Sequence, residues 1–305
     1  MTTELTSAPA GAVVVGVDGS SLSDEALAWA AAEAARSGAP LHVVHAFVHV
    51  SVIGSFSAVS PADRESLGGA VVHAAADRAR AAHDSLPVTE EVCLGPAAPQ
   101  LLNAAKDARM IVLGARGHGR VGGMLVGSVS QQVAMHARCP VVVVRGSTDH
   151  TDGPVVIGMD GSPEAGAALR FGLRHADGVG APVRVVRAEY LESPPGVPPG
   201  EWYADLVDRL HEMTESVRAE VDAAREEFPR LDLDLRVIRR HPVKALVEES
   251  ADARLVVVAS RGLGGFTGLL LGSVSQGVLS RAPVPVAIVP RSGAERQVGE
   301  ERQIP

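Results

Sequence analysis

Short apolar runs alternate along this chain with longer segments of helical character. In the first half, runs rich in Val, Ile and Leu predict strands at residues 12–17, 41–48, 88–94, 110–114 and 141–145. The stretches between them predict helices at residues 23–37, 61–85, 99–108 and 128–136. Nearly continuous Val and Ile runs separated by helices are typical of a parallel sheet covered on both faces. We therefore expect an α/β fold built from a five-stranded, parallel, doubly wound (Rossmann-like) sheet.

The second half of the chain repeats the first. The segment VVVGVDGS at 13–20 returns as VVIGMDGS at 155–162, and GSVSQ at 127–131 returns unchanged at 272–276. A period of about 145 residues is too long for the unit of a solenoid. The repeat therefore indicates two tandem copies of a whole domain.

The domain boundaries follow from this repeat. A chain of 305 residues exceeds the roughly 100–200 residues of a typical single domain. We predict a first domain at 1–147 and a second at 154–292, with a polar, turn-rich linker between them. The charged residues 293–305 show no periodicity, and we predict that they form a disordered tail.

Composition narrows the possible functions. The formal net charge is −8 and only 3% of the residues are aromatic, which argues against a generic nucleic-acid binder. No apolar run approaches the ~20 residues of a transmembrane helix, and residues 1–10 carry no secretory signal. Cys93 and Cys139 are the only cysteines, so a disulfide framework is excluded and both are expected to be buried small residues. We expect a cytoplasmic protein with no nucleic-acid or membrane partner.

Residues 112–130 carry the most informative motif. This stretch leaves a predicted strand, passes several glycines and enters a predicted helix at Gly127 and Ser128. Ligands of open parallel sheets bind beyond the carboxyl ends of the strands. Glycines let backbone N–H groups approach an anion, and a helix start adds partial positive charge. Together with the hydroxyl of Ser128 and the cation of Arg116, the loop predicts a phosphate site.

An alternative interpretation is that these glycines only permit tight packing. The second copy argues against it, because Arg261, Gly262 and the pair Gly272-Ser273 keep their spacing while the residues between them vary. The segment 117–122 also spells GxGxxG, but it follows the fourth strand rather than the first, so we do not interpret it as a dinucleotide site. No GxxxxGK[ST] motif occurs, which excludes a P-loop NTPase.

The spacing of the loop residues resembles the ATP-binding branch of the universal stress protein family. That branch carries G-x2-G-x9-G-[ST], which Gly114, Gly117 and the pair Gly127-Ser128 match completely. The second copy matches from Gly262 onward and has Ala259 in place of the first glycine. The resemblance covers nearly the whole chain. It implies a tandem protein with one site per domain for ATP, with Mg²⁺ as the accompanying ion.

The resemblance also assigns site residues. They are the aspartate after the first strand, an alanine of the second strand whose backbone meets adenine, and the loop that holds phosphate and ribose. In the first copy these are Asp18, Ala46, Gly114, Arg116, Gly117, Gly127, Ser128 and Val129. In the second copy they are Asp160, Ala188, Ala259, Arg261, Gly262, Gly272, Ser273 and Val274.

Two features of the first copy have alternative interpretations. Asp18 either contacts a ribose hydroxyl or Mg²⁺, or it caps the following helix. His42, His45 and His49 lie in or near the second strand. Since no acidic partners are evident, we expect solvated or edge histidines rather than a metal site. His118 lies in the phosphate loop, but its counterpart in the second copy is a leucine.

Three classes of function remain open. The first is a nucleotide-dependent stress-response or signalling module with an unknown protein partner. The second is a slow ATP hydrolase or adenylyl-transfer enzyme, for which Arg116 or Arg120 offers a cation but no base is evident, so no catalytic residue is assigned. The third is an interaction scaffold. The resemblance further implies that the two halves pair within the chain through their last strands, and it allows a homodimer.

Overall fold

The computed structural model describes residues 8–48, 68–117, 126–145, 152–190, 201–263 and 270–291. The chain divides into two compact units, Met1–Arg145 and Gly146–Pro305, which we describe separately. Several predictions fall outside the described residues: the tail at 293–305, the start of the helix at 61–85, and the residues His49, His118 and Arg120.

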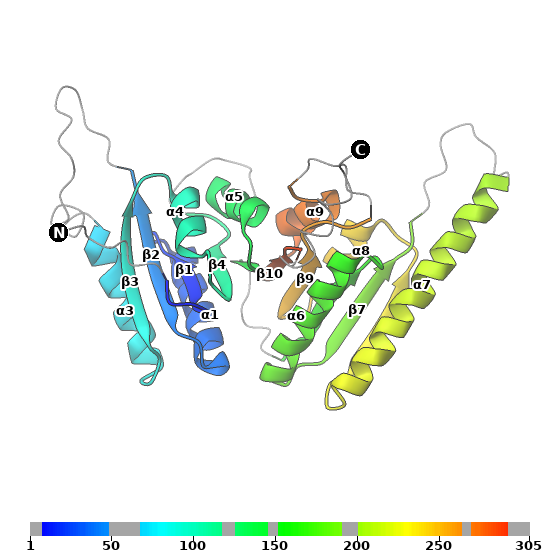
Figure 1. Ribbon diagram of the computed structural model, residues 1–305, viewed down its shortest axis with the longest axis horizontal. Coiled ribbons are helices and arrows are strands. Elements are labelled where there is room, and N and C mark those ends of the chain that lie inside the picture. Colours follow the sequence, from blue (N-terminus) through cyan, green and yellow to red (C-terminus); the bar gives the residue numbers. More distant parts are fainter. Residues whose placement is uncertain are drawn as a thin grey trace, which may run out of the picture. The chain divides into compact units, whose positions relative to one another are not determined.

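The first unit is a five-stranded parallel sheet. Its strands are β1 Val13–Gly16, β2 Leu41–Phe47, β3 Val88–Leu94, β4 Met110–Gly114 and β5 Val141–Val144. They lie in the order β3-β2-β1-β4-β5 (Figure 1). Because β1 pairs with both β2 and β4, the chain first extends the sheet on one side of β1, through β2 and β3, and then on the other side, through β4 and β5. This confirms the predicted α/β, doubly wound class.

Helices cover both faces of this sheet. The described ones are α1 Ser21–Ser37, α3 Ala70–Ala82, α4 Ala97–Ala104 and α5 Ser128–His136. α1 packs against α3, and α4 packs against α5; right-handed crossovers place these two pairs on opposite faces. Ser20 caps α1, since its Oγ accepts a hydrogen bond of 3.3 Å from the backbone N–H of Ser23. Gly38 ends the helix in the left-handed conformation, at φ 65°.

The second unit repeats this architecture. Its strands are β6 Val155–Met159, β7 Val183–Ala188, β8 Leu233–Ile238, β9 Leu255–Ala259 and β10 Val286–Val289, in the order β8-β7-β6-β9-β10. Its helices are α6 Pro163–Val179, α7 Glu201–Glu227, α8 Pro242–Glu249 and α9 Ser273–Arg281. The helix α7 has 27 residues, whereas its counterpart α3 has 13. Ser162 caps α6 as Ser20 caps α1.

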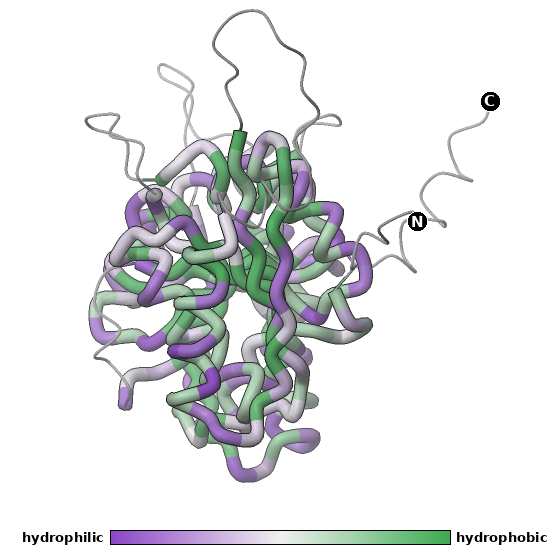
Figure 2. The backbone as a smooth tube through the Cα atoms, turned by 90° about the vertical axis from the view of Figure 1, so that its left-hand side faces the viewer, coloured by the Kyte–Doolittle hydropathy of each residue, from purple (hydrophilic) through white to green (hydrophobic). Residues whose placement is uncertain are grey.

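Aliphatic side chains of the central strands form the core of each unit. Val13, Val14 and Val15 of β1 are fully buried, as are Val155 and Val156 of β6. The helices carry hydrophobic and hydrophilic residues in turn, as the tube in Figure 2 shows, and this suits elements that cover a sheet with one face. The buried residues of α1 are mostly alanines, so small side chains rather than aromatic rings make its contacts with the sheet.

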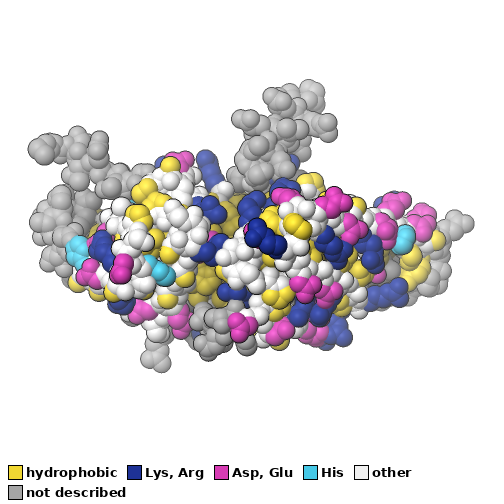
Figure 3. All heavy atoms as spheres, turned by 90° about the horizontal axis from the view of Figure 1, so that it is seen from below, with side chains coloured by type: hydrophobic (Ala, Val, Ile, Leu, Met, Phe, Trp, Pro, Cys, Tyr) yellow, Lys and Arg dark blue, Asp and Glu magenta, His cyan; other side chains and the backbone are white. Residues whose placement is uncertain are grey.

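The surface and the cysteines agree with the composition. Basic and acidic side chains lie intermingled over the face drawn in Figure 3. Cys93 and Cys139 are both free and buried, as predicted. Among the described residues, no helix is both long and apolar enough to cross a membrane.

Candidate functional site

A pocket of about 690 Å³ opens at the carboxyl ends of the strands in the second unit. The ends of β6, β7 and β9, the loop after β9 and the first turn of α9 form its walls. All the residues predicted for the second site line it: Asp160, Ala188, Ala259, Arg261, Gly262, Gly272, Ser273 and Val274. The structure therefore brings together residues that the sequence places more than a hundred positions apart.

Asp160 fastens the loop after β9 to the end of β6. Its Oδ1 accepts hydrogen bonds from the backbone N–H and the hydroxyl of Ser162, at 3.0 and 2.6 Å. Its Oδ2 accepts one from the backbone N–H of Leu263, at 2.9 Å. A β-carbon added to Gly262 would overlap Oδ2. The glycine at this position is thus required by the carboxylate that lies against it.

The first unit has the same arrangement. Asp18 Oδ1 accepts from the backbone N–H and hydroxyl of Ser20, at 3.0 and 2.6 Å, and a β-carbon on Gly117 would overlap Asp18 Oδ2. Asp18 is therefore not itself the residue that caps α1. The cap of α1 is Ser20, and Asp18 holds this cap in place.

The starts of α5 and α9 present backbone N–H groups next to the ends of β4 and β9. The backbone N–H of Gly272 donates to the carbonyl of Ser260 at 2.8 Å, and that of Gly127 donates to the carbonyl of Ala115 at 2.7 Å. Among the described residues, no side chain caps either helix. The first N–H groups of a helix have no partner within it, so they are available to an anion.

Neither of these two glycines is required by its own conformation. Gly272 has φ −71° and ψ 157°, and Gly127 has φ −72° and ψ 154°, angles that any residue adopts. A β-carbon on Gly272 would meet its nearest neighbours at 3.5 Å, and one on Gly127 at 3.4 Å, which is ordinary van der Waals contact. Within the described part of the chain, neither glycine therefore relieves a clash, and the missing side chain leaves room at the helix start.

Gly114 has a different role, and here the packing interpretation is right. A β-carbon on Gly114 would lie 2.7 Å from the carbonyl oxygen of Leu22, at the start of α1. Its counterpart Ala259 carries this carbon and remains buried in the pocket wall, at 8% exposure. The first glycine of the motif thus sets the helix–strand distance in the first unit only.

Two serines that sequence reasoning missed hold the helix starts in place. The hydroxyl of Ser130 donates to the carbonyl of Gly114 at 2.7 Å, and that of Ser275 donates to the carbonyl of Ala259 at 2.7 Å. Each therefore ties the first turn of a helix to the end of the strand before it. The unchanged repetition of GSVSQ in both copies was the signal that could have identified them.

The first site is described through its flanks, because residues 118–125 lie outside the described part of the chain. Asp18 meets Gly117 beside Ser20, and Gly127 meets Ala115 at the start of α5. Ala46 lies near the end of β2, as Ala188 ends β7. These four predicted residues of the first copy thus take the same places in their unit as their counterparts take in the second.

Sequence reasoning also missed two buried arginines. Arg145 follows β5 and Arg187 lies near the end of β7, with 8% and 4% exposure. In both, Nε and Nη2 lack a hydrogen-bond partner within the described structure. Burial and, as the smaller cause, the positive charge of Arg116 together lower the pKa of Arg145 to about 10. Burial also lowers the pKa of Arg187, although Asp160 and Glu189 oppose this effect.

The expectation that the histidines of β2 are solvated was wrong for His42. This side chain is fully buried, and its Nδ1 and Nε2 lie 2.8 Å from Thr89 Oγ1 and 3.0 Å from Glu91 Oε2. The acidic partner stands on the neighbouring strand β3, which alternation along a single strand does not reveal. Among the described residues, no group of three or more His, Cys, Asp or Glu side chains is placed to hold a metal ion.

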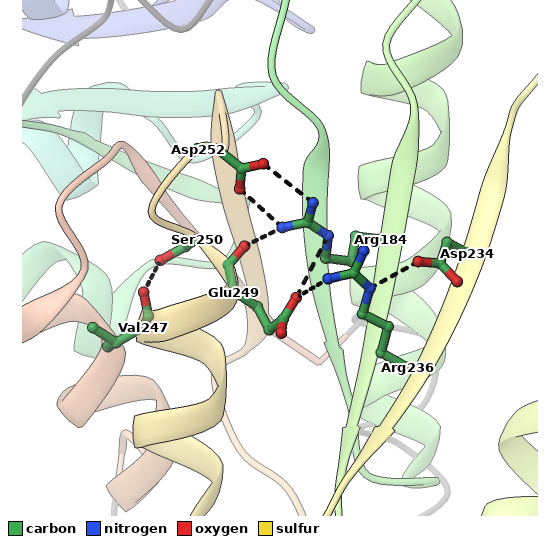
Figure 4. Close-up of polar contacts among 7 residues, drawn as sticks. All are labelled: Arg184, Asp234, Arg236, Val247, Glu249, Ser250 and Asp252. Carbon is green, nitrogen blue, oxygen red and sulfur yellow. Dashed lines mark hydrogen bonds and ion pairs between the residues drawn. The ribbon is translucent and has the colours of Figure 1, made fainter.

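Arg184 takes the position of His42 in the second unit and fixes β7 (Figure 4). Its Nη1 donates to the carbonyl of Glu249 at 2.6 Å and to Asp252 Oδ1 at 2.9 Å. Arg236 of β8 donates to Glu249 Oε2 at 2.6 Å and to Asp234 Oδ2 at 2.8 Å. These contacts connect β7 and β8 to the end of α8, and thus hold the strand whose carboxyl end forms one wall of the pocket.

Comparison with known proteins places both units in one family. The model of the universal stress protein family matches residues 10–145 and 153–290. A universal stress protein of Mycobacterium tuberculosis is 35% identical over 294 residues, which cover 92% of this chain and 97% of that protein. One from Mycolicibacterium smegmatis is 36% identical over 290 residues, with 91% and 96% covered. A solved universal stress protein from Archaeoglobus fulgidus shares the fold, with a TM-score of 0.66 at 22% identity over 93% of this chain and 97% of that one.

Proposed function

Because the chain belongs to the universal stress protein family, with one family domain in each half, we propose that each half binds one molecule of ATP. In this proposal the protein is a cytoplasmic, nucleotide-dependent stress-response module. The two cysteines are free and buried, which is compatible with a reducing compartment.

The single observation that carries the proposal is the pocket of the second unit. It combines an uncapped helix start at Gly272, a glycine that leaves space there without structural need, and the cation of Arg261 in the same wall. These features fit the phosphate groups of a nucleotide. The apolar residues Ala188, Leu210 and Met213 line the same pocket and fit a base.

The contacts of Asp160 limit how Mg²⁺ would be held. Both of its carboxylate oxygens already accept hydrogen bonds from Ser162 and Leu263. Magnesium keeps most of its water ligands and is usually bound through one or two carboxylates together with substrate phosphates. We therefore propose that Mg²⁺ enters with ATP and is held mainly by its phosphates, while Asp160 shapes the loop around them.

Calorimetric titration of the full-length chain with ATP and Mg²⁺ tests this function. The proposal predicts two ATP per chain, and one for either Gly127→Ala or Gly272→Ala. A β-carbon at these positions meets only ordinary contacts within the protein, so both variants are expected to fold as the wild type does. Gly166→Ala is the matched control, because a β-carbon on Gly166 in α6 also meets its nearest atoms at 3.5 Å and this residue does not line the pocket. A folded wild-type chain that takes up no ATP would contradict the proposal.

A further inference from the structure

We propose that Arg187 reads the base of the ligand in the second unit, and that it lets this unit accept guanine nucleotides as well as ATP. The inference rests on the proposed function, because it names which nucleotides the same pocket takes. It starts from one position at which the two copies differ. His45 occupies this position in the first unit, and Arg187 occupies it in the second.

The two side chains differ in the hydrogen-bond partners that the protein supplies to them. His45 Nδ1 lies 2.7 Å from the carbonyl oxygen of Val17, and its ring stacks on Phe47 with centroids 6.1 Å apart. Arg187 forms part of the pocket wall and is 4% exposed. Its Nε and Nη2 find no acceptor within the described residues. Within the described structure, a buried donor without an acceptor is therefore present at this position in the second unit and not in the first.

The acids nearest to Arg187 do not neutralise it. Asp160 and Glu189 both act on its pKa, yet burial lowers that pKa overall. The oxygens of Asp160 accept from Ser162 and Leu263. Glu189 Oε1 accepts from the hydroxyl of Thr214 at 2.9 Å. Because a buried guanidinium without acceptors is costly, a ligand atom that accepts from it stabilises the complex.

The position of Arg187 in the sheet places it at the base end of the pocket. Arg187 lies on β7, and β6 separates β7 from β9, which leads to the uncapped helix start. Two strand spacings amount to about 10 Å, so the backbone of β7 at Arg187 is offset by about that distance from the strand that leads to the phosphate end. Tyr190 and His241, whose rings pack edge to face with centroids 5.2 Å apart, line the pocket close to the end of β7. Such a surface suits a planar base.

The donor geometry of Arg187 favours guanine over adenine. Nε and Nη2 lie on the same side of the planar guanidinium and donate in parallel, so they match an edge with two adjacent acceptors. Guanine offers this pair in O6 and N7, whereas the same edge of adenine presents one acceptor and an amino donor. A further phosphate group would offer two acceptors as well. However, the negative charges of Asp160 and Glu189 beside Arg187 disfavour a second anion and favour a neutral edge.

Titrations of the full-length chain with ATP and with GTP, each with Mg²⁺, test this inference. We expect the wild type to bind two ATP but one GTP per chain. Arg187→His installs the residue of the first copy and should weaken GTP binding about tenfold or more, while ATP binding changes less than about threefold. His45→Arg should add a second GTP site. Arg239→His is the matched control, because this arginine is 92% exposed and makes one long contact with Glu189.

The outcomes separate this inference from the proposed function. If the wild type binds ATP but no GTP, or if Arg187→His leaves GTP binding unchanged, the inference is wrong and the proposed function stands. If Arg187→His weakens the binding of ATP and GTP equally, and that of AMP and GMP less, then Arg187 contacts phosphate, and the inference that it contacts the base is wrong. If the wild type binds neither nucleotide, the proposed function itself fails. Thermal unfolding checks each variant, and removal of an uncompensated buried charge is not expected to lower its melting temperature.

Discussion

The carboxylate of Asp160 fills the space that a side chain on Gly262 would need. The same relationship joins Asp18 to Gly117 in the first unit. In both copies, therefore, an aspartate after the first strand of the unit holds the backbone of the glycine loop by direct contact. The aspartate and the second glycine of the motif, which lie about a hundred residues apart in the sequence, therefore act as one structural element.

This contact predicts different effects for two glycines of the same loop. Gly262→Ala places a β-carbon against Asp160 Oδ2, so the carboxylate must move and its hydrogen bond to Leu263 is lost. We expect a loss of unfolding free energy of about 1–3 kcal/mol. Gly272→Ala meets its nearest atoms at 3.5 Å and should change stability by less than about 1 kcal/mol. Urea unfolding of both variants measures the difference, and equal stability of the two would show that the Asp160 contact is not tight.

The ion pairs of Figure 4 predict a dependence of stability on pH. The hydrogen bond from Arg184 lowers the pKa of Asp252 below its ordinary value of 3.8. The stabilisation of the folded chain by this interaction is therefore complete at a pH above the pKa of Asp252 in the unfolded chain. It is lost as the pH falls through the lower pKa that Asp252 has in the folded chain. Since the Asp252 side chain is 63% exposed, we expect Asp252→Asn to cost less than about 1 kcal/mol at pH 7.

Urea unfolding at several pH values checks this prediction. The gap between the wild type and Asp252→Asn should stay constant from pH 7 down to about pH 5 and close only below about pH 4. Asp222→Asn is the control for an exposed pair within one helix. A gap that closed between pH 7 and pH 5 would show that another group, rather than Asp252, is responsible.

Much of the fold follows from the sequence because local and long-range preferences agree. The Val runs around Val13 and Val155 are apolar at every position, and such runs become central strands of a parallel sheet. Because the second half of the chain repeats the first, the strands and helices of the second unit can be predicted from those of the first. The start of α1 differs from the prediction by two residues, since the helix begins at Ser21, directly after its cap Ser20.

The site was only partly predictable, for the same physical reason in each case. The motif spacing identified Gly114 and Gly272. It did not show that the backbone of Leu22 requires the first to be glycine, whereas no neighbour among the residues that the structure describes requires the second to be one. That distinction depends on neighbours far away in sequence. Likewise, the sequence identifies His42 and Arg187 only as strand residues. The pairing of β2 with β3 shows what His42 faces, and the lining of the pocket shows what Arg187 faces.

Cys139 should be chemically inert in the folded chain. Burial raises the pKa of its thiol to about 12, so almost none of it is thiolate at neutral pH. We expect alkylation by a soluble maleimide at pH 8 to be slow in the native protein and rapid in denaturant. Mass spectrometry of the Cys139 peptide measures both rates, and native labelling as fast as in denaturant would show that this strand end opens readily.

The most direct test of the account is the number of nucleotides that one chain holds. Freshly purified full-length protein is denatured, the released nucleotides are separated by chromatography, and their amount is divided by the amount of protein. The stripped and refolded chain is then saturated with ATP and Mg²⁺ in equilibrium dialysis. We predict two bound nucleotides per chain, with guanine nucleotides able to replace one of them. A chain that keeps its native fold yet holds no nucleotide in either measurement would contradict the account.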